Sequence, residues 1–204
     1  MYRSVQSTGD RYSQEVPRAT DPGKRTELLD KVVRHLEHHG LAGLSLSPLA
    51  EAVGTSKRML LYYFGSRENL LAQALAASRP DAEAMFGPVH DAAGLHTAAR
   101  ELWEAITVGR QRGLVRMLLQ LLSLATTQPE PYGALAADSV EVMVGPIAAA
   151  YARLGYDEGD ARVRATLLVS GLRGLCQDRL VTGDTARIDA AAHRLIEDAT
   201  SPAR

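Results

Sequence analysis

A single cysteine, Cys176, occurs among the 204 residues, which rules out an intrachain disulfide and suits a reducing compartment. No segment approaches the roughly 18 uninterrupted apolar residues of a membrane span. The first twenty residues lack the apolar centre of a signal peptide. The chain also lacks a phosphate loop, a dinucleotide-binding glycine motif and a nucleophile elbow. These absences predict a cytoplasmic protein that is not an enzyme and uses no membrane, cofactor or metal.

The chain has almost no excess of positive or negative charge, because its formal net charge is −1. Its distribution is uneven. Residues 1–72 hold ten Lys or Arg against eight Asp or Glu, whereas residues 73–204 hold thirteen against sixteen. A nucleic-acid partner would therefore bind the N-terminal part through a few well-placed charges rather than through a broadly basic surface. The apolar share of 46% is enough for a hydrophobic core.

Helical periodicity runs through the chain, and no strand alternation occurs. Leu28, Val32 and Leu36 form one stripe of a helix over 24–39, which Asp21 begins and Gly40 ends. Further helices are expected at 66–77, 96–108, 114–126, 132–154, 157–180 and 185–199, with a broken helix and loops over 79–95. Together with the two described next, they predict an all-α fold of about nine helices.

The most informative stretch is 45–71, which reads as a helix, a glycine turn and a second helix. Gly54 ends the first helix where the backbone usually needs a positive φ. Ser56 is a natural N-cap for the second helix, in which Leu60 and Phe64 point inward. Its outward positions carry Lys, Arg and Tyr, the side chains that base edges and phosphates require. The sequence therefore predicts a DNA-binding helix-turn-helix.

The run from Lys24 to about Leu75 resembles the N-terminal domain of the TetR family of transcriptional regulators. The resemblance is carried by an ordered set of motifs: a leading amphipathic helix, Leu-Ala-x-x-x-Gly at 49–54, Ser-Lys at 56–57, Tyr-Tyr-Phe at 62–64 and Ser-Arg-Glu-x-Leu-Leu at 66–71. It implies an all-α homodimer whose larger helical domain binds a small molecule. It also implies a repressor whose two recognition helices enter successive major grooves of a palindromic operator until an effector shifts their spacing.

Two positions depart from the family pattern. Leu61 stands where a tyrosine that touches the DNA backbone is common, and Met59 stands where a small residue is usual. Tyr63 and Arg67 match phosphate-contacting positions, and Lys57 and Arg58 are expected to contact bases. The full set of expected DNA-binding residues is Ser45, Ser56, Lys57, Arg58, Met59, Leu61, Tyr62, Tyr63 and Arg67.

Three segments are expected: a flexible tail over 1–20, the DNA-binding domain over 21–72, and a helical effector-binding and dimerisation domain over 73–204. The tail holds Arg3, Arg11 and Arg18, which either reach along DNA or belong to a plain disordered extension.

Within the C-terminal domain, the helix over 157–180 carries the signal for assembly. Its expected dimer interface consists of Val163, Leu167, Ser170, Gly171, Gly174 and Leu175. The small residues among them would let another helix approach closely, from the partner subunit or from the same chain.

The expected effector pocket is lined by Trp103, Met117, Leu121, Met143, Tyr151 and Arg173. Bulky, adaptable side chains suit an apolar or amphipathic effector, although each of them also fits an ordinary core position. Arg173 either orients an acid or carbonyl group of the ligand or forms a salt bridge.

Other chemistry has weaker support in the sequence. His35 and His39 lie four residues apart and form either a metal pair or a solvated helix end. Cys176 is either a redox sensor or a small buried hydrophobe. Two further functional classes stay open: a helical small-molecule-binding protein or activator with altered DNA recognition, and a helical enzyme, which would need titratable residues converging on the C-terminal pocket.

Overall fold

The computed structural model describes residues 21–41, 44–109 and 112–201. These residues form ten helices and no strand: α1 (Pro22–His39), α2 (Leu46–Ala52), α3 (Lys57–Phe64), α4 (Arg67–Ser78), α5 (Ala82–Phe86), α6 (Ala92–Thr107), α7 (Arg112–Thr127), α8 (Pro129–Arg153), α9 (Glu158–Thr182) and α10 (Thr185–Thr200). The predicted all-α class is confirmed. The short α5 lies in the segment that was expected to be a broken helix. The predicted tail over 1–20 lies outside the described residues.

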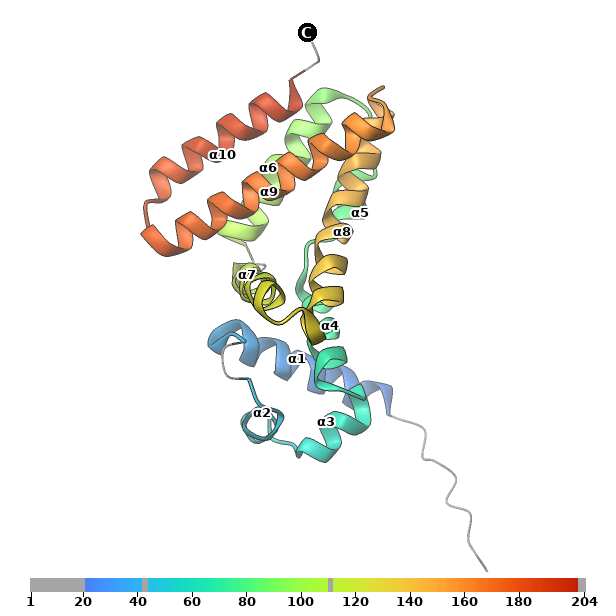
Figure 1. The fold of residues 1–204 in the computed structure, drawn as a ribbon, viewed down its shortest axis with the longest axis vertical. Helices are drawn as coiled ribbons and strands as arrows, with labels where there is room; N and C mark the ends of the chain where they lie inside the picture. Colours follow the sequence, from blue (N-terminus) through green and yellow to red (C-terminus); the bar gives the residue numbers. More distant parts are fainter. Residues whose placement is uncertain (1–20, 42–43, 110–111, 202–204) are drawn as a thin grey trace, which may run out of the picture.

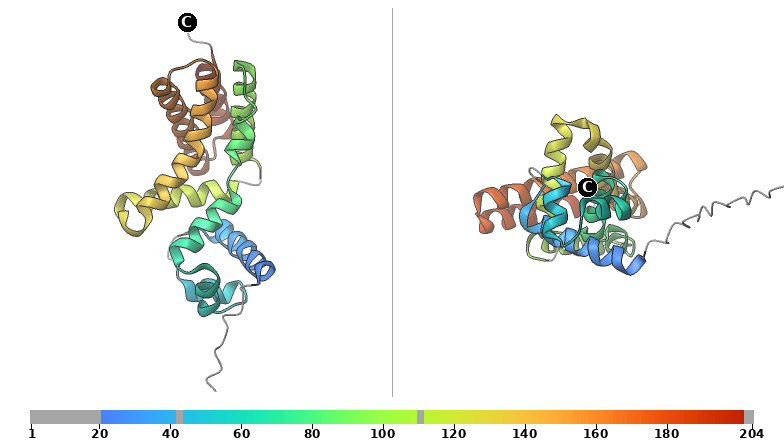
Figure 2. Two further views of the ribbon diagram at one scale, coloured as in Figure 1. Left: turned by 90° about the vertical axis from the view of Figure 1, so that its right-hand side faces the viewer. Right: turned by 90° about the horizontal axis from the view of Figure 1, so that it is seen from below.

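The helices form an elongated molecule with two ends (Figure 1). Helices α1, α2 and α3 make up one end, whereas α9 and α10 lie at the other, as the side view also shows (Figure 2). Helices α4 and α7 lie between the two ends and contact each other. A conformational change that passes between the two ends therefore involves α4, α7 or the N-terminal part of α8.

Local sequence signals account for the helices at the end formed by α1, α2 and α3, which is the predicted DNA-binding end. The carboxylate of Asp21 accepts a hydrogen bond from the backbone N–H of Gly23 at 3.0 Å, and α1 ends at Gly40 with a φ of 74°. Gly54 has a φ of 75° in the turn between α2 and α3, a conformation that costs glycine little. The hydroxyl of Ser66 caps α4 by accepting from the backbone N–H of Asn69. The predicted caps and turns are thus confirmed.

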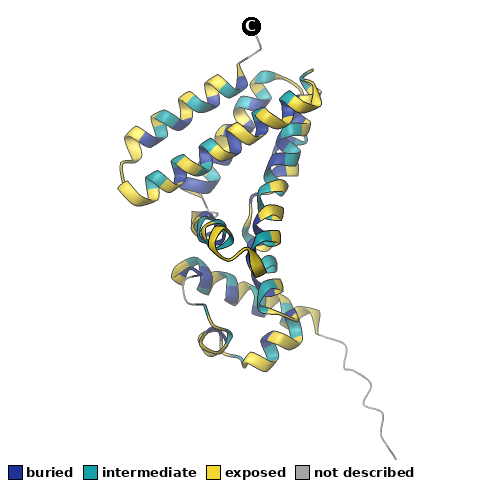
Figure 3. Ribbon diagram, in the orientation of Figure 1, coloured by how far each residue is buried: buried dark blue, intermediate teal, exposed yellow. Residues whose placement is uncertain are grey.

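Two hydrophobic clusters fill the interior. The division between them does not coincide with the expected domain boundary between residues 72 and 73. The first cluster joins α1–α4 to Met117 and Leu121 of α7 and to Tyr132 of α8. The second is built from α5–α10. Helix α4 runs without interruption through residue 72. Buried residues occur on the helices at both ends of the molecule (Figure 3). The first cluster is therefore completed by residues that come about 40 to 60 positions after the end of α4 in the sequence.

Helix α7 packs closely against the end of α1. A Cβ atom on Gly113 would lie 2.9 Å from the Cβ of Glu37, so only glycine permits this approach. The guanidinium of Arg116 donates to the backbone carbonyl of Glu37, and the side-chain oxygen of Gln120 accepts from the backbone N–H of Leu41 at 2.6 Å. The first bond satisfies a carbonyl that α1 leaves unpaired at its C-terminus, and the second pairs the backbone N–H of the residue that follows the C-cap Gly40.

Helix α8 is the only described helix that is long and apolar enough to cross a membrane. It contacts α4, α5, α7 and α9, so its apolar residues are also those of a helix that packs on several neighbours.

Candidate DNA-binding surface and ligand cavity

Helix α3, the predicted recognition helix, has a buried and an exposed face, as expected from its sequence. Leu60 and Phe64 are buried in the first cluster. Lys57 and Arg58 are exposed, and neither forms an ion pair within the described chain. Both cations are therefore available to an anionic partner.

The exposed face of α3 also carries apolar and aromatic groups. Leu61 is 36% exposed and Tyr62 is 50% exposed, whereas Met59 is half-buried. The ring of Tyr62 stands edge-on to the ring of Tyr63, with 5.2 Å between their centroids. This mixture of cations, aromatic rings and a leucine is suited to phosphate and groove contacts more than to a dense set of base hydrogen bonds.

Two of the residues predicted to contact DNA, Ser45 and Ser56, are the N-caps of α2 and α3. Ser45 begins α2 without a side-chain capping bond, which leaves its exposed hydroxyl available. The hydroxyl of Ser56 accepts from the backbone N–H of Met59 at 3.2 Å. Ser56 can still donate to a phosphate while it holds this cap.

Tyr63 and Arg67, the predicted phosphate anchors, are both half-buried. The backbone carbonyl of Tyr63 accepts from the guanidinium of Arg25 at 3.4 Å. The guanidinium of Arg67 lies over the ring of Tyr132, 5.7 Å from its centroid, and its Nε is buried without an acceptor. Arg67 thus links the start of α4 to α8, a contact that the sequence did not predict.

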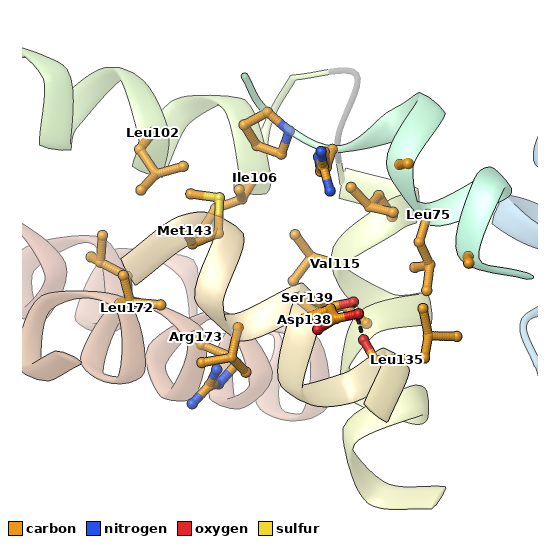
Figure 4. A pocket seen from close by; sticks show the side chains of 18 residues that line it. Leu75, Leu102, Ile106, Val115, Leu135, Asp138, Ser139, Met143, Leu172 and Arg173 are labelled. Atoms are coloured by element: carbon orange, nitrogen blue, oxygen red, sulfur yellow. Dashed lines mark hydrogen bonds between the residues drawn. The ribbon is translucent and has the colours of Figure 1, made fainter. Parts of the chain in front are cut away.

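A cavity of about 300 Å³ lies among α4, α6, α7, α8 and α9. Most of its walls are apolar side chains, such as Leu75, Leu102 and Leu172. Figure 4 shows these walls from close by, with Asp138 on α8 and Arg173 on α9 among the polar groups. The volume is within the range of small-molecule sites.

The cavity contains two of the six predicted pocket residues, Met143 and Arg173. The other four do not line this cavity. Met117 and Leu121 are buried in the first cluster, on the side of α7 that packs on α1 and α4. Their neighbours Val115 and Leu118 line the cavity instead.

Trp103 and Tyr151 are held by hydrogen bonds outside the cavity. The indole N–H of Trp103 donates to Asp189 Oδ1 on α10 at 3.2 Å, while the adjacent Leu102 lines the cavity. The hydroxyl of Tyr151 donates to the backbone carbonyl of Ala199 at 2.9 Å, and burial raises the pKa of Tyr151 to about 12. Both side chains hold α10 onto the second cluster.

Part of the cavity was not predicted from the sequence. Leu75, Ala76, Arg79 and Pro80 contribute the end of α4 and the residues that follow it. The signal that could have revealed them is the unbroken apolar pattern of α4 beyond residue 72. Helix α4 also contacts α1 and α3, so the cavity is lined by a helix that packs against the predicted DNA-binding helices.

Helix α9 carries an exposed apolar stripe. Val163 is 56% exposed and Leu167 is 64% exposed, and Ser170 and Gly174 are exposed on later turns. Gly174 has no atom within 4 Å of a Cβ built on it. These four predicted interface residues recur at steps of four, three and four, the spacing of a helix–helix seam.

The other two predicted interface residues pack within the chain. A Cβ on Gly171 would lie 2.5 Å from Leu195 Cδ2, so this glycine lets α10 approach α9. Leu175 is half-buried against the second cluster. At Gly171 and Leu175 the packing partner therefore comes from the same chain, which is the alternative to a partner subunit that the sequence left open.

The weaker chemical candidates have ordinary surroundings. The rings of His35 and His39 stack with centroids 4.1 Å apart, and no cluster of three potential metal ligands occurs among the described residues. Partial burial, followed by the charge of His39, lowers the pKa of His35. Cys176 is buried, and burial raises the pKa of its thiol to about 11, so little thiolate exists at neutral pH.

Comparison with known proteins found a family match in the N-terminal part of the chain. Residues 28–74 match the model of a family described as bacterial regulatory proteins, tetR family. Over 55 residues the chain is 33% identical to the HTH-type transcriptional regulator BetI of Agrobacterium fabrum. This similarity spans 27% of each of the two chains.

Solved structures extend the likeness to most of the chain. A TetR-family transcriptional regulator from a Rhodococcus species has a TM-score of 0.67 at 20% identity, covering 87% of this chain and 98% of its own. One from Mesorhizobium loti has a TM-score of 0.66 at 18% identity, covering 87% and 95%. NalD of Pseudomonas aeruginosa, the secondary repressor of the MexAB-OprM multidrug efflux pump, has a TM-score of 0.64 at 18% identity, covering 87% and 93%. At these identities the likeness establishes the fold.

Proposed function

We propose that this chain, which belongs to the TetR family of transcriptional regulators by its N-terminal domain and its fold, is a cytoplasmic repressor that binds a palindromic operator as a dimer. A small apolar or amphipathic effector in the cavity releases it. The observation that carries this proposal is α3, whose exposed face presents Lys57 and Arg58 without ion-pair partners in the described chain. The description of NalD as a repressor supports repression over activation.

The dimer would form through α9 and α10 of each subunit. The stripe of Val163, Leu167, Ser170 and Gly174 is exposed on α9, and α10 packs beside α9 in the same chain. Two copies would bury the stripe in a four-helix contact. A two-fold dimer would place two recognition helices on half-sites about one helical turn of DNA, or a multiple of it, apart.

The effector would act through α4 and α7. Helix α7 lines the cavity with Val115 and Leu118 and packs on α1 with its other side, and α4 runs from the recognition helix into the cavity. A ligand that fits one arrangement of these two helices better than another would shift the orientation of α1–α3.

Arg58→Ala should weaken binding by about 1–3 kcal/mol at the preferred operator and relax the preference at particular base pairs, because arginine pairs with guanine O6 and N7. Selection of bound duplexes from a random pool, for both proteins, would measure this preference. Unchanged selectivity would refute the assignment of Arg58 to a base.

Arg67→Ala should weaken binding about equally on all sequences and lower the slope of log affinity against log salt by about one, if Arg67 contacts a phosphate. Its contact with Tyr132 offers a different role. Lower thermal stability with an unchanged salt slope would show that Arg67 only joins α4 to α8. Tyr132→Leu is the matched variant, since it removes the ring and leaves the arginine.

A helical binding protein or activator with altered DNA recognition is the second candidate, favoured by one observation. Met59 stands in place of the family's usual small residue and Leu61 in place of its common tyrosine, so both add apolar atoms to the face expected to meet DNA. The regulator should bind duplexes from a random pool with an affinity that falls steeply as salt rises. A protein that binds none of these duplexes at low salt would favour the second candidate.

A further inference from the structure

Arg173 differs from the other arginines of α9. Three of the four form ion pairs within the described chain: Arg162 with Glu141, Arg164 with Asp160, and Arg179 with Asp189. The guanidinium of Arg173 has no carboxylate partner there, and its one hydrogen bond is donated to the hydroxyl of Ser170 at 3.2 Å. It has further N–H groups available for an acceptor.

Arg173 lies where a ligand in the cavity could reach its guanidinium. The residue is half-buried at the edge of the cavity, where it also borders an open groove among α7, α8 and α9. Burial lowers the pKa of its guanidinium, although the group stays charged at neutral pH. A half-buried cation without a counter-ion is costly, and a bound anion would offset that cost.

The remaining charges of the cavity are Arg79 and Asp138, and neither has an ion pair in the described chain. Two guanidiniums against one carboxylate leave one positive charge around the space. The hydroxyl of Ser139 donates to the backbone carbonyl of Leu135 at 2.7 Å, so its proton is already committed. The other lining residues are mostly apolar.

We propose that the cavity binds an amphipathic monoanion. Its carboxylate would pair with the Arg173 guanidinium, and its hydrocarbon part would lie against the apolar walls contributed by Leu102, Val115 and Met143. Asp138 would disfavour a second carboxylate by repulsion. This inference rests on the proposed function, because it names the ligand class of the effector cavity.

Three probes with equal chains and different head groups test the charge preference: octanoate, 1-octanol and octylammonium. Calorimetric titration of the full chain, without DNA, should show octanoate binding about tenfold more tightly than 1-octanol, since a charge-assisted hydrogen bond adds at least 1.4 kcal/mol. Octylammonium should bind most weakly. Trp103, the only tryptophan, follows the lining residue Leu102 and offers a fluorescence signal for the same titration.

Arg173→Gln should remove the preference for octanoate while it keeps the affinity for 1-octanol, which shows that the cavity is intact. Arg162→Gln is the matched control, because it changes an arginine of the same helix outside the cavity and should leave the preference unchanged. Asp138→Asn should strengthen octanoate binding.

Equal binding of octanoate and 1-octanol, tighter binding of octylammonium, or no binding of octanoate would each overturn the proposal. The proposed function is tested separately by duplex binding without any ligand. A protein that binds duplexes but does not prefer octanoate is a regulator with another ligand class. A protein that prefers octanoate and binds no duplex keeps the ligand assignment and loses the regulator.

Discussion

Leu167→Glu should convert the protein to a monomer and reduce operator affinity by about a hundredfold or more. The side chain is 64% exposed in the middle of the α9 stripe, between Val163 and Ser170. In the proposed dimer the stripe faces its own copy across a two-fold axis, so the substitution would place two carboxylates close together in an apolar contact. A monomer also loses the avidity of two linked half-site contacts, which commonly amounts to about 10²–10⁴.

Sedimentation equilibrium gives the mass of both proteins, and titration of an operator duplex gives the affinities. Val108→Glu is the control, because Val108 is another exposed apolar residue, just beyond α6 and outside the stripe. It should leave both mass and affinity unchanged. A dimeric Leu167→Glu protein would contradict the assignment of α9 to the interface.

Phe64→Ala should destabilise the protein by about 3–5 kcal/mol and remove DNA binding. The ring is buried in the first cluster, and the guanidinium of Arg25 lies 5.4 Å from its centroid. Truncation leaves a cavity beneath α3, where the neighbouring helices cannot all close the space. The recognition helix would lose the packing that orients its exposed face.

Urea unfolding followed by circular dichroism measures the change, and duplex titration measures its effect on binding. Leu61→Ala, on the exposed face of the same helix, should change stability by no more than about 0.5 kcal/mol. If Phe64→Ala does not fold, Phe64→Leu should cost about 1 kcal/mol and keep DNA binding. An unchanged urea midpoint in both Phe64 variants would contradict the role of the ring.

The DNA-binding end shows how far local sequence signals reach. Asp21, Gly40, Gly54 and Ser56 act on their own helix ends, through caps and positive-φ turns that need no distant partner. The inward position of Phe64 follows from helical periodicity in the same way. These features were therefore predictable, together with the family likeness of residues 28–74.

The cavity shows where such signals end. Periodicity indicates that Met117 and Val115 lie on different sides of α7, but it does not say which side meets the cavity and which meets α1. Bulk alone selected Trp103 and Tyr151, which hydrogen bonds to α10 hold in the core. The residues that α4 contributes to the cavity were not predicted, because the expected domain boundary after residue 72 divided this helix, whereas its buried residues continue to Leu75.

By itself, the sequence determined most of the helices and their caps, the exposed cations of α3 and the apolar stripe of α9, because each depends on residues a few positions apart. It did not give the bounds of α5 or the start of α6 at Ala92, which lie in the segment expected to hold a broken helix and loops. Only the tertiary structure decided that α10 covers Gly171, that Arg67 contacts Tyr132, and that Arg173 lies half-buried at a cavity without a carboxylate partner of its own in the described chain. Those facts depend on which helices cross and how closely. That is a property of the whole packed chain, because a side chain's neighbours come from elements distant in sequence.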